Sequence, residues 1–243
     1  MRLPAGGGTL RRMAFSAGAQ PVGPGAEPGH DGWEARALQR SLATARARSI
    51  DRSHRIVAAA RELADETGSA GFTMAQVGAR AGVSLKTVYR CFEGKDDLLL
   101  ALLEEESRVG AEILAQRIEA QPEPSDPLAR LRAFIDGIFE LLTFPGREGY
   151  AGVLAREHHR LETSRADDLR TALAPLAELL GRELRAATAA GRLDPGDPER
   201  ATDTVFTLVL SGISQVTRGR AEAADTAAWV WRFCTSGLQA KGP

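Results

Sequence analysis

The chain has 243 residues, of which 43% are hydrophobic and 26% are charged, and its formal net charge is −1. This length allows a small domain and a larger one, each with its own core. Few aromatic residues, many alanines and leucines, and little clustering of β-branched residues favour an all-α protein. No apolar run approaches the ~20 residues that cross a bilayer, and no secretory signal is recognisable, so a cytoplasmic protein is expected.

Charge is distributed unevenly along the sequence. Residues 46–95 hold 9 Lys and Arg against 5 Asp and Glu, whereas residues 96–243 hold 17 against 24. A basic segment followed by an acidic body is typical of a DNA-binding domain joined to a domain that does not bind DNA. Random variation of surface residues is the alternative. The two cysteines, Cys91 and Cys234, fit no metal-ligand spacing and suit a reducing compartment.

Residues 1–45 are predicted to form an N-terminal extension that is disordered or loosely helical. Its first part is rich in Gly, Pro and Ala, which bury little surface and interrupt helices and strands. Its second part is helix-friendly and leads into Arg46, Arg48 and Arg52, which could reach phosphates or the minor groove. A solvated tail without fixed contacts is an equal alternative. Met13 is a second candidate for the true start, and the sequence leaves that choice open.

Residues 46–94 are predicted to form a DNA-binding domain of three helices. The first helix is expected from about Ser53 to Thr67, and Gly68 ends it. Its apolar residues recur three and four positions apart, which predicts one buried stripe under the two helices that follow.

The two following helices are short, and a tight turn joins them. Thr73 can cap the first, Gly82 supplies the left-handed turn that ends it, and Ser84 can cap the second, from Leu85 to Phe92. This arrangement is the helix-turn-helix, whose second helix enters the DNA major groove. The segment is therefore predicted to bind DNA.

The predicted DNA contacts lie mainly on the outward face of the second short helix. Lys86 and Arg90 are expected to contact bases or phosphates, and Leu85 could press on a thymine methyl group. Lys95 opens the next helix, whose first amide groups form a natural phosphate clamp beside it. The full set of predicted DNA contacts is Arg52, Arg55, Thr73, Ser84, Leu85, Lys86, Thr87, Tyr89, Arg90 and Lys95.

Residues and spacing between Phe72 and Leu98 resemble the TetR family of bacterial transcriptional regulators. The resemblance is carried by Phe72-Thr73, Ala81–Ser84, Thr87–Phe92 and Gly94–Leu98. The resemblance implies an N-terminal three-helix helix-turn-helix domain and a larger C-terminal helical domain that binds a ligand and dimerises. It also implies a homodimer that binds a palindromic operator and is released by a small hydrophobic effector.

Residues 95–243 are predicted to form that ligand-binding and dimerisation domain. A long helix is expected from Lys95 to about Ala120. Asp126 and Asp197 can each cap a helix that has proline at its first position. A capping box is expected to start another helix at Ser164.

The helix that follows Pro127 is apolar over more than one stripe, which places it centrally and favours a cavity beside it. A cavity is implied by the family resemblance, and plain core packing is the alternative. The predicted ligand-pocket residues are Phe134, Ile138, Phe139, Leu142, Tyr150, Leu154, His158 and Leu176. His158 also belongs to a cluster with Glu157, His159 and Glu162, for which surface or helix-capping roles are expected. The cluster lacks a third spaced ligand, so no metal and no cofactor are expected.

The last two helices, about 198–217 and 225–239, are apolar on more than one side. Burying both sides calls for a partner, and a large internal core is the alternative. In the TetR family the final two long helices form the dimer interface, and Gly212 would allow close helix approach. The predicted dimer-interface residues are Val205, Leu208, Val209, Gly212, Ile213, Val216, Trp229, Val230, Phe233 and Leu238.

The sequence thus predicts a homodimeric, cytoplasmic, ligand-responsive transcriptional regulator that is not an enzyme. Its partners would be double-stranded operator DNA, a small hydrophobic effector and a second copy of the chain. A repressor is the expected form, and an activator is the alternative. Two rival functions are an enzyme that uses the acidic body, with the helix-turn-helix as an accessory, and a nonspecific DNA-binding protein. The sequence names neither the effector, nor the operator, nor the regulated genes.

Overall fold

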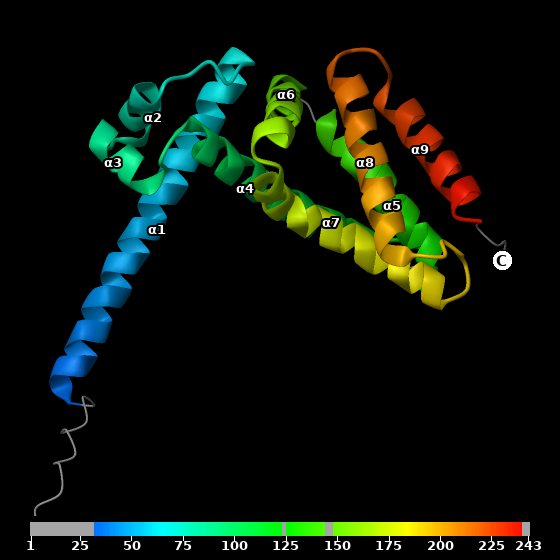
Figure 1. Ribbon diagram of the computed structural model, residues 1–243, viewed down its shortest axis with the longest axis horizontal. Coiled ribbons are helices and arrows are strands. Elements are labelled where there is room, and N and C mark those ends of the chain that lie inside the picture. The colour runs from blue at the N-terminus through cyan, green and yellow to red at the C-terminus, as the bar shows by residue number, and fades with distance from the viewer. Residues whose placement is uncertain (1–31, 123–124, 144–147, 240–243) are drawn as a thin grey trace, which may run out of the picture. The chain divides into compact units, whose positions relative to one another are not determined.

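The computed structural model describes residues 32–122, 125–143 and 148–239, which form helices and turns without strands (Figure 1). The prediction of an all-α protein is confirmed. None of the helices in the described part is long and apolar enough to cross a membrane. The helices are α1 (Trp33–Thr67), α2 (Met74–Ala81), α3 (Leu85–Cys91), α4 (Lys95–Glu119), α5 (Pro127–Leu142), α6 (Glu148–Ser164), α7 (Ala166–Ala189), α8 (Pro198–Thr217) and α9 (Ala223–Gly237).

The chain divides into two structural units, Met1–Arg46 and Ala47–Pro243. The described end of the first unit is helical and belongs to α1, so α1 begins at Trp33 and the predicted start near Ser53 is wrong. No Gly or Pro interrupts α1, and the Ser53 hydroxyl donates to the Ser49 carbonyl (3.2 Å) instead of capping a helix start.

Helices α2 and α3 have the predicted caps. The Thr73 hydroxyl accepts from the Gln76 amide (3.2 Å), while the Gln76 side chain accepts from the Thr73 amide (2.7 Å), which completes a capping box. Gly82 has a φ of 67° at the end of α2, a conformation that favours glycine. The Ser84 hydroxyl accepts from the Thr87 amide (3.2 Å) at the start of α3. The local geometry of the helix-turn-helix is therefore set by these hydrogen bonds.

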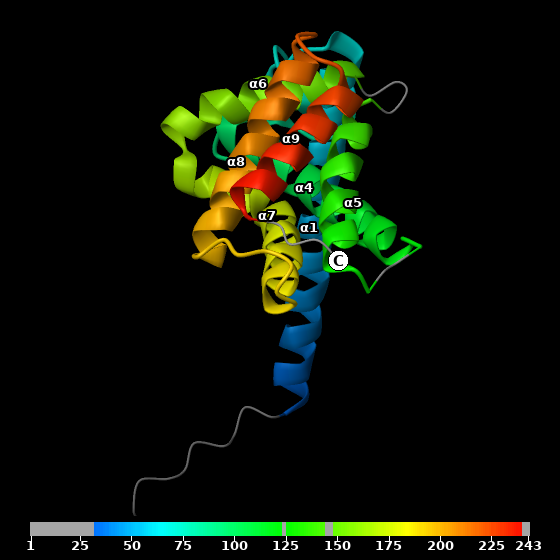
Figure 2. The ribbon, with the colours of Figure 1, turned by 90° about the vertical axis from the view of Figure 1, so that its right-hand side faces the viewer.

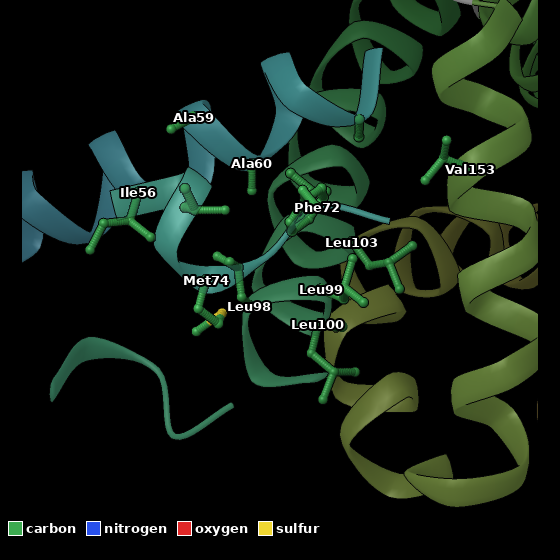
Figure 3. Packing of buried hydrophobic residues seen from close by; sticks show 14 of the residues in the cluster. Ile56, Ala59, Ala60, Phe72, Met74, Leu98, Leu99, Leu100, Leu103 and Val153 are labelled. Carbon is green, nitrogen blue, oxygen red and sulfur yellow. The ribbon is translucent and has the colours of Figure 1, made fainter. Parts of the chain in front are cut away.

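One buried cluster holds the helix-turn-helix together with α1 and α4. Ile56, Val77, Val88 and Leu98 are each 0% exposed. Figure 3 shows Ile56, Ala60 and Leu98 near one another between α1 and the first turns of α4. Burial of apolar side chains at this density stabilises a domain of this size by about 1.5–3 kcal/mol per large residue. The buried inner face of α3 therefore fixes the helix in place, and its outer face stays exposed to solvent.

The second buried cluster lies in the body, among α4, α5, α7, α8 and α9. Asp126 caps α5 and Asp197 caps α8, each followed by proline, so both predicted starts are confirmed. In Figure 2, α8 and α9 lie side by side, and their packing is part of this cluster. The buried carboxylate of Glu183 (1% exposed) ion-pairs with Arg130 at 2.7 Å, which joins α7 to α5.

The predicted capping box at Ser164 is wrong. Ser164 is the last residue of α6, and its hydroxyl donates to the Arg160 carbonyl (3.4 Å). α7 begins at Ala166 with Arg165 as its N-cap, and no side chain caps it. The cap fails because the chain is still helical at Ser164, whereas an N-cap residue has an extended backbone. The sequence also predicts that Pro145-Gly146 ends the helix that follows Pro127, and these two residues lie outside the described part of the chain.

Candidate DNA-binding surface and ligand cavity

Helix α3 presents an open polar face on one side of the helix-turn-helix. Lys86 and Arg90 are exposed, Tyr89 is 50% exposed and Leu85 is 44% exposed, whereas Val88 is fully buried. Among the described residues, the side chains of Lys86, Tyr89 and Arg90 form no hydrogen bond or ion pair. A short helix that keeps its cationic and hydroxyl groups unpaired is free to donate to DNA bases and phosphates.

The three predicted hydroxyl contacts lie at the starts of α2 and α3, where they are engaged in capping. The Ser84 and Thr87 hydroxyls are 2.9 Å apart, and the Thr73 hydroxyl lies 3.0 Å from the Gln76 side-chain oxygen. These positions set the helix starts, whose free amide groups point outward and favour anions. Their direct contact with DNA stays a prediction.

Lys95 lies in the first turn of α4, as predicted. Its ammonium is 4.8 Å from the centroid of the Phe72 ring, a cation–π geometry that fixes its position. A phosphate at this helix start would meet the ammonium together with the positive end of the helix.

The remaining predicted contacts, Arg52 and Arg55, lie on α1. Arg55 is exposed and 3.8 Å from Asp51 on the same helix, while Arg52 is half-buried. Their proposed contact with phosphate stays a prediction. The sequence did not indicate the structural role of another arginine, Arg80 on α2. Its guanidinium forms a bidentate pair with Glu66 on α1 (2.8 and 2.9 Å), and this pair lowers the pKa of Glu66. It holds α2 in place and is not a free contact for DNA.

A cavity of about 610 Å³ lies in the body, bounded by α4, α5, α6, α7 and α8. Apolar side chains make most of its wall, as ligand sites generally require. Six of the eight predicted pocket residues line it: Ile138, Leu142, Tyr150, Leu154, His158 and Leu176.

Phe134 and Phe139 do not line the cavity, which corrects the prediction. They are 0% and 1% exposed and belong to the core that packs α5 against the other helices. The sequence pattern of α5 marks every apolar position on its broad face, and it cannot separate those that face the cavity from those that face the core.

The polar residues of the cavity wall differ in exposure. Tyr150 is 3% exposed and the Glu106 side chain 14% exposed. The side chains of His159 and Glu162, which also line the cavity, are 73% and 61% exposed. Burial lowers the pKa of His158. Among the described residues there is no group of three or more side chains suited to a metal ion.

One part of the cavity wall is joined to α1. Arg61 on α1 ion-pairs with Glu106 on α4 at 2.5 Å, and the buried phenol of Tyr150 lies near both charges. Burial raises the pKa of Tyr150 far above its usual value. No sequence pattern indicates this cluster, because its three members come from helices far apart in the chain and none belongs to a local motif.

Helix α6 is also tied to the DNA-binding domain by hydrogen bonds and ion pairs. Arg156 donates to the Gly68 carbonyl at the end of α1 (2.6 Å), and Arg160 pairs with Asp96 at the start of α4 (2.6 Å). Helix α6, which lines the cavity, is thus connected directly to the end of α1 and the start of α4.

Fewer of the predicted dimer-interface residues are exposed than expected. Val205, Val209 and Val230 are at most 3% exposed and belong to the chain's own core, which corrects the prediction for these three residues. Gly212 does allow a close approach, but within the chain: a Cβ there would lie 2.7 Å from the Phe139 ring.

The exposed part of that face is aromatic. Trp229 and Phe233 are 48% and 56% exposed, and their rings stack with centroids 5.4 Å apart. Of the predicted set, Leu208, Ile213 and Val216 are half-buried on α8, and Leu238 is half-buried directly after α9.

Comparison with known proteins identifies the DNA-binding half. Residues 56–102 match the model of the tetR family of bacterial regulatory proteins. Comparison with curated proteins gives no match.

The fold of most of the chain is similar to that of solved regulators. FadR from Bacillus subtilis, in complex with stearoyl-CoA, is 21% identical, with a TM-score of 0.61 over 76% of this chain and 98% of that chain. FadR from Thermus thermophilus, a TetR-family transcriptional repressor in complex with lauroyl-CoA, is 20% identical, with a TM-score of 0.62 over 79% of this chain and 97% of that chain. RolR in complex with resorcinol is 19% identical, with a TM-score of 0.58 over 77% and 89%. Identities of this size establish the shared fold alone.

Proposed function

We propose that this chain, whose residues 56–102 match the model of the tetR family of bacterial regulatory proteins, is a repressor that binds a palindromic operator as a homodimer. The free polar face of α3 is the single observation that carries this proposal. Lys86, Tyr89 and Arg90 are held outward by the buried Val88 and have no partner among the described residues. A major groove supplies the acceptors and phosphates that these groups need.

The homodimer would form through the exposed aromatic part of α9 and the adjoining face of α8. Trp229 and Phe233 together leave a stacked aromatic pair in solvent, and exposed aromatic pairs are enriched in interface centres. A two-fold symmetric contact there would present two copies of α3 to the same duplex. Changing Trp229→Ser together with Phe233→Ser is expected to yield monomers in sedimentation analysis, and persistence of the dimer would contradict this assignment.

The ligand would bind in the cavity of the body. Its wall is mainly apolar and its volume of about 610 Å³ suits a small molecule with a large apolar part. FadR from Bacillus subtilis was solved with stearoyl-CoA, whose acyl chain is such a part, and RolR was solved with resorcinol, a small aromatic diol. A ligand that prefers one arrangement of α6 would shift the α3 helices away from the spacing of the operator and release DNA.

The proposed function is tested by DNA binding. A labelled duplex from the region upstream of the chain's own gene is titrated with protein, and a scrambled duplex of equal length is the competitor. The proposal expects affinity for the upstream duplex at least about tenfold above the scrambled one at the same salt concentration. Equal affinities would favour the rival of a nonspecific DNA-binding protein.

A further inference from the structure

Two arginines on the cavity wall have no partner within the described part of the chain. Arg218 directly follows α8 and Arg220 comes two residues later, and both are exposed and line the cavity. Their guanidinium groups form no hydrogen bond or ion pair with any described residue. Other arginines of the body are engaged: Arg160 pairs with a carboxylate at 2.6 Å and Arg185 with another at 3.0 Å. The two arginines on the wall are therefore available to a ligand.

A left-handed turn fixes the backbone that carries these two arginines. Gly219 lies between them and has a φ of 66°, which favours glycine. Its amide donates to the Val216 carbonyl (2.9 Å), and the Arg220 amide donates to the Gln215 carbonyl (3.0 Å). This pair of bonds is the Schellman motif, which ends a helix in a defined geometry. The backbone is thus ordered before a ligand arrives, which reduces the entropy lost on binding.

A free hydroxyl group lies one helical turn before Arg218. Ser214 also lines the cavity, and residues four apart on a helix lie on the same face, with Cβ atoms about 5–6 Å apart. The Thr217 hydroxyl donates back to the Ile213 carbonyl (2.9 Å), whereas the Ser214 hydroxyl bonds to none of the described residues. Ser214 can therefore donate to the same bound group as Arg218.

The charges on the wall favour an anion over a cation. Among the described residues that line the cavity, the acids are Glu106 and Glu162. Glu106 is neutralised by its ion pair with Arg61, so Glu162 alone stands against Arg218 and Arg220. The two histidines of the wall carry no negative charge in either protonation state. The described wall thus has an excess of positive charge, which attracts an anionic group.

We propose, on the premise of the proposed function, that the effector is an apolar molecule with a carboxylate or phosphate group, and that Arg218, Arg220 and Ser214 bind this group. A guanidinium donates two parallel hydrogen bonds to either kind of anion. Because both arginines are exposed, the anion keeps part of its hydration and the cost of burying a charge is avoided. The apolar part of the molecule packs against the wall that includes Leu154 and Leu176.

The experiment compares four probes that share a ten-carbon chain and differ in the head group: decanoate, decyl phosphate, decanol and decyltrimethylammonium. Each is titrated below its micelle concentration into the full-length protein by calorimetry at neutral pH. The tighter of the two anions is expected to bind at least about tenfold more tightly than decanol and the cation. The ratio of the two anion affinities shows whether the site prefers a carboxylate or a phosphate.

Three substitutions remove the proposed donors. Arg218→Gln and Arg220→Gln are each expected to weaken the tighter anion about tenfold, because each removes a charge-assisted contact, and to leave decanol unchanged. Ser214→Ala is expected to weaken it about threefold, because a hydroxyl contributes less than a guanidinium. Added salt should weaken the anion in the wild type more than in the variant that combines both arginine substitutions.

Arg200→Gln is the matched control. Arg200 lies on α8 as well, and its side chain is exposed and without a partner among the described residues, but it does not line the cavity. The substitution removes the same charge from the same helix, and it is expected to leave the affinities for all four probes unchanged.

The inference is overturned if decanol or the cation binds the wild type as tightly as the tighter anion, or if no probe binds. It is also overturned if the anion affinity of the combined arginine variant equals that of Arg200→Gln. Melting curves check that each variant folds, and the two single arginine variants are compared with Arg200→Gln in the same way if the combined variant does not fold.

Operator binding by the same samples without probe is scored separately. Protein that binds operator DNA but does not prefer an anion keeps the proposed function and loses this inference. Protein that shows the expected order of probes but binds no operator keeps the anion site and loses the proposed function.

Discussion

The two halves of the molecule use their polar side chains in opposite ways. The helix-turn-helix buries Val88 and turns Lys86 and Arg90 outward, so its contacts with a partner are ready before the partner arrives. The body buries Glu106 and Tyr150 among helices far apart in the sequence, so its site exists only once the whole body is folded. The DNA-binding surface therefore depends on local geometry, whereas the cavity depends on packing between distant parts of the chain.

The largest expected effect tests the placement of Phe134 in the core. Phe134→Ala should destabilise the protein by about 3–5 kcal/mol, because the fully buried ring leaves a cavity behind. Urea denaturation measures the loss. Ile113→Ala, at a cavity-lining position that is 41% exposed, is the control and should cost much less. Similar losses in both variants would show that Phe134 is not a core residue.

The next effect separates two roles within the DNA-binding half. Lys86→Ala should cost about 1–3 kcal/mol of operator affinity and change which bases are preferred, because Lys86 lies on the exposed face of α3. Lys95→Ala should weaken binding to all sequences alike and lower the slope of affinity against salt by about one. Fluorescence anisotropy over several salt concentrations measures both. The same uniform loss in both variants would contradict the division of roles.

A smaller effect tests the local caps. Ser84→Ala should cost about 1 kcal/mol of stability, since the Thr87 amide loses the hydroxyl that accepts from it (3.2 Å). Operator affinity should fall in parallel because α3 frays. Ser164→Ala is the control, because Ser164 caps no helix and should change neither quantity. Equal losses from the two changes would mean that the cap at Ser84 does not stabilise α3.

The smallest effect concerns pH and the cavity. Burial lowers the pKa of His158 below its ordinary value of 6.5, and His159 adds to this while Glu162 opposes it. The unfolded chain therefore binds a proton first as the pH falls, and the group costs stability below about pH 6.5. His158→Gln should lose less stability than the wild type between about pH 7.5 and pH 5, by under about 1 kcal/mol since the ring is partly solvated.

Urea denaturation at both pH values measures that difference. His159→Gln, at the neighbouring exposed position, is the control. An identical pH dependence in the wild type and the His158→Gln variant would show that burial of this imidazole does not couple stability to pH.

The features that could be predicted from the sequence are those that depend on a few adjacent residues. The caps at Thr73 and Ser84, the glycine turn at Gly82 and the proline-headed start of α5 all follow from local hydrogen bonding and steric preference. Each can be recognised from residue types at fixed spacing, and the family resemblance depends on the same residues.

The predictions that were wrong or missing concern residues that are far apart in the sequence but meet in the fold. An apolar residue such as Val209 has the same pattern whether it faces its own core or a partner, so the pattern overestimated the dimer face. The contact between Arg61 and Glu106 joins two helices of ordinary charged composition, and no spacing marks either residue. The start of α1 was missed because the residues before Ser53 also favour a helix, so no local signal marks where it begins.

The most direct test of the central claim is selection of binding sites from a pool of random duplexes by the full-length protein. We expect rounds of selection with the wild type to enrich one sequence with two-fold symmetry, and selection with Lys86→Ala to enrich a different sequence or none. Recovery of unrelated duplexes by the wild type, with no common symmetric site, would contradict the claim that α3 reads DNA as a paired element.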